Sequence, residues 1–353
     1  MKVRFSEGHR EYKTVWMSNK TIFLIDQRKL PEKFEIYKSE NHRKTALAIK
    51  NMIVRGAPAI GATSAYSMAQ AALEFQGENI KKFFEHLEKA KKVLIRTRPT
   101  AFDLFHAVDE ITEKIKKAKS VNEAKKIAII SSKKYAKKIE IACKKIGIFG
   151  NKLIKNGDKI LTHCNAGALG CVDHGTALAV IREAHYSKKK IFVWVDETRP
   201  RLQGAKLTSW ELINEGIPHA IIADNAAGYF MQKGEVDLCI VGADRIAING
   251  DFANKIGTYE KAVLAKENSI PFYVAAPLTT FDKNCNSGKE IKIEERTDDE
   301  VLYLGKRRIA PKGAKARNPA FDITPKRFVT AFITNVGIFK PSEIKKKLVN
   351  VFT

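Results

Sequence analysis

The spacing of hydrophobic positions changes near residue 159 of the chain. Before that point, apolar residues recur every three or four positions, as at 58–75 and 79–95, which predicts amphipathic helices. The longest such pattern begins at Val121 and extends to about Phe149. Two earlier apolar runs, at 12–18 and 21–28, are broken by polar turns and are typical of short strands. Residues 1–148 are therefore predicted to form a small, mostly helical domain with a short β-sheet.

After residue 159, short apolar runs rich in β-branched residues alternate with helical stretches. These runs have the length and composition of strands that are buried on both faces, and they lie at 159–165, 190–198, 218–226, 236–246, 270–278 and 328–339. Strands that alternate with helices indicate a parallel sheet covered on both sides. We therefore predict an α/β fold with a Rossmann-like C-terminal domain over residues 149–353.

Polar clusters follow four of these predicted strands. They are His163-Cys164-Asn165, Asp196 to Arg199, Asp224-Asn225 and Gly242 to Arg245. In open parallel sheets, ligands bind outside the carboxyl ends of the strands. The clusters therefore predict a site built from several segments. No G-x-G-x-x-G motif follows any strand, so a dinucleotide is not the expected ligand.

Two segments carry features of an anion site. In "VRGAPAIGA", Gly56 and Ala57 offer backbone N–H groups at the start of a predicted helix, with Arg55 as a charged donor. A plain helix-capping turn is the alternative interpretation. The pair Asn254-Lys255 is expected to open a helix and to form a second anion site.

Two further polar side chains are candidate ligands on other segments. Arg98 lies in "RTRPTA", just before a helix expected to begin near Thr100, although a surface charge is the default interpretation. Gln203 is the candidate in the polar loop "DETRPRLQGA", where internal salt bridges explain part of the charge.

Cys164 and Asp244 are the candidates for chemistry. An aspartate in an apolar cleft has a raised pKa and can act as a general acid, whereas capping or pairing with Arg245 is the alternative. A thiol near a helix start is expected to have a lowered pKa. For Cys164, core packing, metal ligation and nucleophilic attack are alternatives. The C-x2-4-C and H-x3-5-H spacings typical of zinc sites are missing, so no metal is expected.

Charge and cysteine content limit the partners. The net charge of +24 permits an anionic partner, but most of the excess is lysine on predicted helices, which is typical of a solvated face. No arginine–aromatic stripe is present, so nucleic acid is not expected. Five irregularly spaced cysteines favour reduced thiols in a cytoplasm. No apolar run is long enough to cross a membrane. A membrane is therefore not expected as a partner.

Several strings in order along the chain resemble the methylthioribose-1-phosphate isomerase family. They are "VRGAPAIG", "RTRPTA", "LTHCNAG", "DETRPRLQGAKLTSWEL", "IADNAA", "VGADRIAINGDFANKIGTY", "IPFYVAAPLTTFD", "IKIEER" and "NPAFDITP". The wider superfamily includes the regulatory subunits of translation initiation factor two-B and archaeal ribose-1,5-bisphosphate isomerase. The resemblance implies conversion of 5-methylthioribose 1-phosphate to 5-methylthioribulose 1-phosphate in methionine salvage, by a homodimer without metal or organic cofactor.

The resemblance also implies roles for individual residues. Cys164 and Asp244 match the family's catalytic pair, and the substrate contacts match Arg55, Gly56, Ala57, Arg98, Gln203, Asn254 and Lys255. Asp244 would protonate the ring oxygen, after which hydrogen moves from C2 to C1 as a proton or as a hydride. A related pentose phosphate, such as ribose 1,5-bisphosphate or 5-deoxyribose 1-phosphate, is an alternative substrate. A non-catalytic translation-factor subunit is the alternative of another class.

Overall fold

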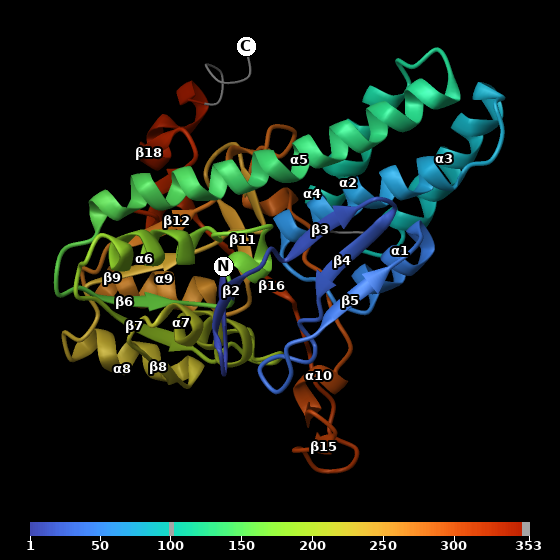
Figure 1. The fold of residues 1–353 in the computed structure, drawn as a ribbon. Coiled ribbons are helices and arrows are strands. Elements are labelled where there is room, and N and C mark those ends of the chain that lie inside the picture. The colour runs from blue at the N-terminus through green and yellow to red at the C-terminus, as the bar shows by residue number, and fades with distance from the viewer. Residues whose placement is uncertain (99–101, 348–353) are drawn as a thin grey trace.

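A helix of 30 residues, α5 (Val121–Gly150), runs along both halves of the molecule (Figure 1). The computed structural model describes residues 1–98 and 102–347. The side chain of Ser120 caps the helix by accepting the N–H of Glu123. One end of α5 packs against α2 and α4, and the other end packs against α6 and β17. The single long helix predicted from Val121 is therefore confirmed.

The N-terminal half is built from helices around a buried α2. Its helices are α1 (His42–Lys50), α2 (Ala57–Glu74), α3 (Ile80–Ile95) and α4 (Phe102–Ile115). Alanine, glycine and serine fill α2, and these small side chains let α4 and α5 pack closely on it. The expected helix start near Thr100 lies outside the described residues.

Five short strands precede these helices. They are β1 (Lys2–Phe5) and β2 (Gly8–Glu11), which form a hairpin, and β3 (Val15–Ser18), β4 (Thr21–Ile25) and β5 (Ile36–Ser39), which form an antiparallel sheet. The two strands predicted from the sequence correspond to β3 and β4. The sheet packs on α2 through buried residues such as Leu24.

The C-terminal half contains a seven-stranded sheet in the order β18-β17-β12-β9-β6-β7-β8. The strands are β6 (Lys159–Thr162), β7 (Phe192–Asp196), β8 (His219–Ile222), β9 (Leu238–Val241), β12 (Phe272–Ala275), β17 (Ala331–Thr334) and β18 (Gly337–Phe339). All neighbours are parallel except β17 and β18, which form an antiparallel hairpin within the single run predicted at 328–339.

Helices cover both faces of this sheet. They are α6 (Ala177–Tyr186), α7 (Ser209–Glu215), α8 (Ala227–Gln232) and α9 (Thr258–Glu267). Ile160 packs with residues of α5 and α6 on one face, and its neighbour Leu161 packs with residues of α8 and α9 on the other. Because both faces are buried, the strands read as continuous apolar runs.

A second, four-stranded sheet follows the order β13-β10-β11-β16. Its strands are β10 (Arg245–Ala247), β11 (Phe252–Lys255), β13 (Phe281–Asp282) and β16 (Phe321–Thr324). The run predicted at 236–246 is therefore divided between two sheets. A short arm of α10 (Asp299–Leu302), β14 (Tyr303–Leu304) and β15 (Arg307–Arg308) projects away from both (Figure 1).

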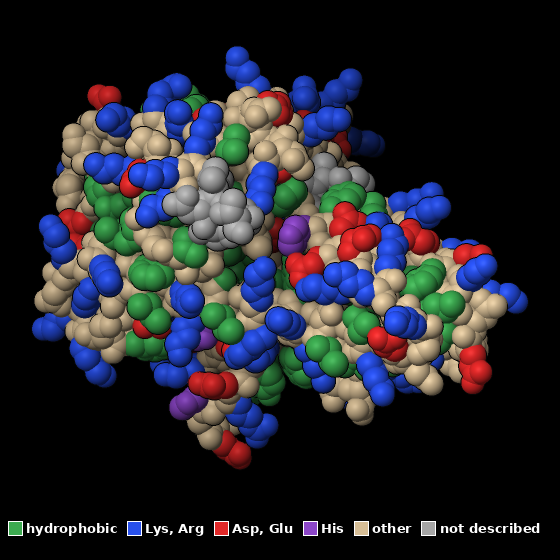
Figure 2. Space-filling view, turned by 90° about the horizontal axis from the view of Figure 1, so that it is seen from above, with side chains coloured by type: hydrophobic (Ala, Val, Ile, Leu, Met, Phe, Trp, Pro, Cys, Tyr) green, Lys and Arg blue, Asp and Glu red, His purple; other side chains and the backbone are tan. Residues whose placement is uncertain are grey.

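The arrangement confirms an α/β fold with a helical N-terminal region and a mostly parallel sheet. The domain boundary at residue 148 stays a prediction, and it falls inside α5, which ends at Gly150. Lysine and arginine side chains are scattered among acidic and apolar ones on the face shown in Figure 2. Among the described residues, no helix combines the length and apolar character needed to span a bilayer.

Candidate active site

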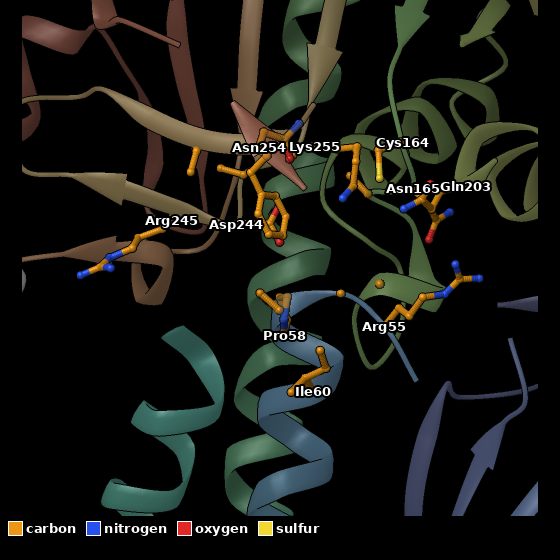
Figure 3. A pocket seen from close by; sticks show the side chains of 18 of the residues that line it. Arg55, Pro58, Ile60, Cys164, Asn165, Gln203, Asp244, Arg245, Asn254 and Lys255 are labelled. Carbon is orange, nitrogen blue, oxygen red and sulfur yellow. The ribbon is translucent and has the colours of Figure 1, made fainter. Parts of the chain in front are cut away.

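One pocket brings together all nine residues singled out in the sequence. It lies where the N-terminus of α2 meets the carboxyl ends of the neighbouring strands β6 and β9 and the edge of the small sheet (Figure 3). Its lining includes Arg55, Gly56, Ala57, Arg98, Cys164, Gln203, Asp244, Asn254 and Lys255. The roles of these residues stay predictions.

The start of α2 has the geometry of an anion cradle. Gly56 is the N-cap with a φ of 89°, and no side chain caps the helix. A Cβ at this position would lie 2.2 Å from the carbonyl oxygen of Gly170, so only glycine permits this close approach. Pro58 occupies the first turn, as expected. The first N–H groups of a helix lack carbonyl partners within it and attract negative charge.

Arg55 adds a cation beside this helix start. Its Nη2 donates to the carbonyl of Gln27 at 3.3 Å, while its buried Nε has no hydrogen-bond partner among the described residues. Burial, together with the positive charge of the nearby Arg201, lowers the pKa of Arg55 to about 10. A buried, incompletely satisfied guanidinium is suited to an anionic ligand.

Cys164 lies two residues beyond the end of β6, with a φ of 63°. Its N–H donates to Oγ1 of Thr198 at 2.9 Å, and its carbonyl accepts from Oγ1 of Thr208 at 2.6 Å. Burial raises the pKa of the thiol, although Lys255 and Arg55 act in the opposite direction. The expectation of a lowered pKa is therefore wrong, because desolvation outweighs the nearby cations.

Asp244 lies between β9 and β10. Burial raises the pKa of its carboxyl, as predicted, and the positive charges of Lys255 and Arg98 oppose the shift. Arg245 is not its partner, because Nε of Arg245 donates to Asp282 at 2.8 Å and the side chain points away from Asp244 (Figure 3). The carboxyl group therefore lies in the pocket without an ion pair to its neighbour in sequence.

Asn254 and Lys255 lie on β11, which corrects the expectation that they open a helix. Lys255 Nζ donates to the carbonyl of Ala320 at 2.6 Å and lies 4.4 Å from the centre of the Phe321 ring. Burial lowers the pKa of Lys255 to about 8. Asn254 Nδ2 donates to Oγ1 of Thr258 at 3.0 Å.

The helix that follows, α9, does not offer the second anion site expected from the sequence. It begins at Thr258, and the carboxylate of Asp322 already accepts the N–H groups of Gly257 and Tyr259, at 2.7 and 3.2 Å. An acidic side chain of the chain itself therefore occupies the positive end of the helix. Any anion bound near Asn254 and Lys255 depends on their side chains.

Gln203 enters the pocket from a π-helical turn, Gly204–Thr208, that leads into α7. Its side chain is buried, and Oε1 has no hydrogen-bond partner among the described residues. Gly204 packs so tightly on β7 that a Cβ would overlap the carbonyl oxygen of Asp196. The turn therefore holds an unpaired amide oxygen at the edge of the pocket, where a ligand hydroxyl can donate to it.

Only two of the four predicted strand-end clusters line the pocket. Asp224, after β8, instead accepts the N–H groups of Thr198 and Arg199, at 2.7 and 2.6 Å. Oδ2 of Asp196, at the end of β7, lies at hydrogen-bond distance from Nδ1 of His163, at 2.9 Å. These carboxylates therefore fix loops rather than face a ligand.

Three of these side chains also lie close enough together to resemble a metal site. His163, Asp196 and Asp224 place ligand-type atoms within 4.8 Å of one another. However, the buried ammonium of Lys261 lies 3.8 Å from Asp196 and supplies a positive charge there. The expected absence of a metal stays a prediction.

The pocket also contains residues that the sequence did not single out. Arg296 and Phe321 complete its wall, and Arg296 Nε donates to Glu294 at 3.1 Å. Arg98 also reaches Glu294, at 3.4 Å. Both added residues lie outside the strands and helices predicted from the sequence. Their only signal was their position within the strings "IKIEER" and "NPAFDITP".

The chain is similar to known proteins over nearly its whole length. Residues 53–341 match the model of the initiation factor 2 subunit family. A methylthioribose-1-phosphate isomerase of Thermoanaerobacter sp. (strain X514) is 51% identical over 338 residues, covering 94% of this chain and 97% of the relative. The corresponding protein of Acetivibrio thermocellus is 51% identical over 325 residues, covering 92% and 95%.

Solved structures give the same result. The crystal structure of 5-methylthioribose 1-phosphate isomerase from Pyrococcus horikoshii OT3 matches with a TM-score of 0.90 and 44% identity, covering 97% of this chain and 96% of that one. A structure described as translation initiation factor eIF-2B, subunit delta, from A. fulgidus matches with a TM-score of 0.84 and 45% identity, covering 94% and 97%. The chain belongs to the initiation factor 2 subunit family and, within it, to the methylthioribose-1-phosphate isomerases.

Proposed function

We propose that this chain converts 5-methylthioribose 1-phosphate to 5-methylthioribulose 1-phosphate, with Cys164 and Asp244 as its catalytic pair. The observation that carries the proposal is their shared pocket. Neighbouring strands β6 and β9 bring them to one cavity with the N-terminus of α2, in a chain about half identical to isomerases of this name. A thiol, a carboxyl that retains its proton and an anion cradle supply the base, the acid and the phosphate binding that the proposed reaction uses.

The substrate's phosphate would bind at Gly56 and Ala57, with Arg55 alongside. Arg98, Asn254 and Lys255 would contact the remaining phosphate and sugar oxygens, and Gln203 would accept from a sugar hydroxyl. The support is that Arg55 and Gln203 have buried polar atoms without partners among the described residues. Hydrogen bonds from a polar ligand to these atoms give binding energy that an apolar ligand cannot provide.

Asp244 would start the reaction as a general acid. The phosphate on C1 prevents the sugar from opening spontaneously, so the ring oxygen must gain a proton as its bond to C1 breaks. Burial raises the pKa of Asp244, which keeps a proton on the carboxyl for this step. The resulting open chain carries a hydroxyl on C4 and electron deficiency at C1.

Two routes then move hydrogen from C2 to C1. In the proton route, the Cys164 thiolate removes the C2 proton, an enol phosphate forms, and C1 is protonated as the C2 hydroxyl becomes a carbonyl. In the hydride route, the C2 hydrogen moves with its electron pair to C1, and the C2 hydroxyl loses its proton. The raised pKa of Cys164 means that the proton route requires a bound substrate or Lys255 to stabilise the thiolate.

The direct test incubates the purified protein with 5-methylthioribose 1-phosphate and follows the ketose by NMR. We expect turnover without added metal and unchanged activity after chelation. Cys164→Ser and Asp244→Asn should each lower kcat by about 100-fold or more. Cys285→Ser is the matched control, because Cys285 lies outside the pocket lining and its Sγ donates to a carbonyl that a hydroxyl can also reach. Full activity in both catalytic variants would show that the assigned roles are wrong.

The same reaction in deuterated water separates the two routes. Deuterium at C1 of the ketose supports proton transfer. Its absence supports hydride transfer or a proton shielded from solvent. Ribose 1,5-bisphosphate and 5-deoxyribose 1-phosphate, assayed in parallel, test the alternative substrates.

A non-catalytic subunit of a translation factor is the second candidate. The similarity to the structure described as subunit delta of eIF-2B from A. fulgidus favours it. A purely regulatory subunit needs neither Cys164 nor Asp244, and this chain has both. Absence of ketose with all three sugar phosphates, together with binding of a sugar phosphate, would support this candidate instead.

The remaining proposals concern the context of the enzyme. We propose a homodimer, which light scattering can test, and a cytoplasmic location, which the five unpaired cysteines support. We also propose that the C-terminal half is Rossmann-like, because six parallel strands carry helices on both faces.

A further inference from the structure

The imidazole of His163 joins two segments of the pocket. His163 immediately precedes Cys164 and is 1% exposed. Its Nε2 lies 2.8 Å from the carbonyl oxygen of Ile256, the residue immediately after Lys255. Since a carbonyl oxygen can only accept, Nε2 carries the hydrogen of this bond. One side chain therefore ties the backbone next to Cys164 to the backbone next to Lys255.

The opposite side of the ring is held as well. Nδ1 lies 2.9 Å from Oδ2 of Asp196, whose carboxylate is 3.8 Å from the buried Lys261 ammonium. The charged groups around the imidazole are Asp196 from β7, Asp224 from the turn after β8, Lys261 from α9 and Asp322 from β16. With hydrogen bonds at both nitrogens, the ring has one orientation in which both are satisfied.

The backbone on the far side is shaped to receive the ring. Gly257 has a φ of 97°, and a Cβ there would lie 3.1 Å from Cε1 and 3.3 Å from Nε2 of His163. Asp322 fixes the same turn by accepting the N–H of Gly257 at 2.7 Å. The contact between the imidazole and residues 256–257 is therefore close and fixed from both sides.

We infer that His163 is a positioning residue that sets the placement of Lys255 relative to Cys164 through its hydrogen bond to the carbonyl of Ile256. The inference rests on the proposed function, in which both residues act on one substrate. His163 holds the two strand ends, β6 and β11, at the separation that the reaction requires. The phosphate cradle at Gly56 belongs to another element and does not depend on this bond.

Two substitutions separate the two hydrogen bonds of the ring. His163→Asn places an amide group where Nδ1 lies, so it keeps a hydrogen bond to Asp196 and loses the bond to Ile256. His163→Gln is longer, so its amide nitrogen reaches the position of Nε2 and keeps the bond to Ile256. Each variant loses one buried hydrogen bond, so the two should lose similar amounts of thermal stability.

Their kinetics should differ. We expect His163→Asn to lower kcat by about 10-fold or more while KM stays near the wild-type value, because a small misplacement of reacting groups slows the chemical step. His163→Gln should restore most of kcat. Wild-type kcat in His163→Asn, or equal losses of kcat in both variants, would overturn the inference.

A second measurement needs no substrate. The rate at which iodoacetamide alkylates Cys164 is followed against pH, with the modified peptide identified by mass spectrometry. Lys255 and Arg55 lower the pKa of Cys164 and Asp244 raises it. Displacing Lys255 in His163→Asn should therefore move the alkylation midpoint to higher pH, and His163→Gln should leave it near the wild-type midpoint. An unchanged midpoint in His163→Asn contradicts the inference.

The two measurements distinguish failure of the inference from failure of the proposed function. If the wild-type protein forms no ketose but the midpoint moves only in His163→Asn, the proposed function is wrong and the positioning role stands. If the wild-type protein forms ketose and neither kcat nor the midpoint changes in His163→Asn, the function stands and the positioning role is wrong.

Discussion

Arg182 and Glu211 form a buried ion pair beneath the loop that follows β6, with Nη2 of the arginine 2.6 Å from Oε2 of the glutamate. Glu211 also accepts the backbone N–H groups of Ala168 and Leu169, at 2.8 and 3.1 Å. The amide of Asn165 donates to the same carboxylate at 2.9 Å. One carboxylate therefore fixes the loop that carries the pocket residues from β6 to α6.

Replacing this carboxylate should destabilise the whole protein. Glu211→Gln leaves Arg182 with Glu215, whose Oε1 is 3.3 Å from its Nε, as its remaining buried carboxylate partner, and places an amide N–H among other donors. We expect the free energy of unfolding to fall by about 3–5 kcal/mol, measured by urea denaturation. Glu113→Gln is the control, because Glu113 pairs with Lys116 on an exposed helix surface and should change little. Equal losses in the two variants would contradict the role assigned to Glu211.

The glycine at the start of α2 should not tolerate a side chain. In Gly56→Ala, the added Cβ meets the backbone of Gly170 at 2.2 Å, in addition to the strain of a positive φ. Gly157→Ala is a matched control, because Gly157 has a φ of 96° and nothing lies within 4 Å of its Cβ position. The control should lose only the backbone strain, about 1 kcal/mol. Urea denaturation should show a clearly larger loss for Gly56→Ala, and its KM for the sugar phosphate should rise.

Lys255 should titrate far below an ordinary lysine. Burial lowers its pKa to about 8, so it loses its positive charge as the pH rises through that value. NMR of lysine labelled with carbon-13 at Cε can follow this directly, with Lys255→Arg identifying the signal by its absence. Adding inorganic phosphate should raise the pKa, because a bound anion favours the ammonium. A midpoint above pH 10 in the empty protein would show that the side chain is solvated.

Asp103 should make the protein less stable as the pH rises. Burial raises its pKa from 3.8 to about 7, and its Oδ1 has no partner among the described residues. Between these values the unfolded chain releases the proton while the folded chain retains it, so stability falls with increasing pH. The loss is at most about 4 kcal/mol, since each pKa unit corresponds to about 1.4 kcal/mol.

The variant Asp103→Asn removes this titration. Its stability relative to wild type should therefore improve between pH 4 and pH 7, as measured by urea denaturation at each pH. Asp109→Asn is the control, because Asp109 is an exposed carboxylate of the same helix. The assignment fails if the advantage of Asp103→Asn over wild type is the same at every pH.

Periodicity predicted the elements that are long or buried on both faces. The helix from Val121 and the strand before Cys164 have strong patterns because their surroundings are uniform along their length. The small sheet was missed because its strands are two to four residues long and no period is visible over that length. Asn254 and Lys255 consequently looked like a helix start.

The direction of the pKa shifts in the pocket was harder to predict from the sequence. The neighbours of Cys164 suggested a lowered pKa, but desolvation of the thiol raises it, and desolvation depends on residues brought in from remote segments. Arg296 and Phe321 show the same limitation, because they lie far along the chain from Cys164 and Asp244 and reach the pocket only when the chain is folded. The strand ends indicated where the site lies, but not how far its side chains are shielded from solvent.

The continuity of α5 affects how the pocket can select its substrate. At about 1.5 Å per residue, its 30 residues make a rod of about 45 Å, without proline. Both halves of the molecule pack against α5. At Gly147 the contact is so close that a Cβ would lie only 2.8 Å from the carbonyl oxygen of Ala179 on α6. If the two halves of the molecule moved apart, α5 would have to bend. We therefore expect α5 to keep the width of the cavity nearly constant, so that the pocket selects sugar phosphates by their length.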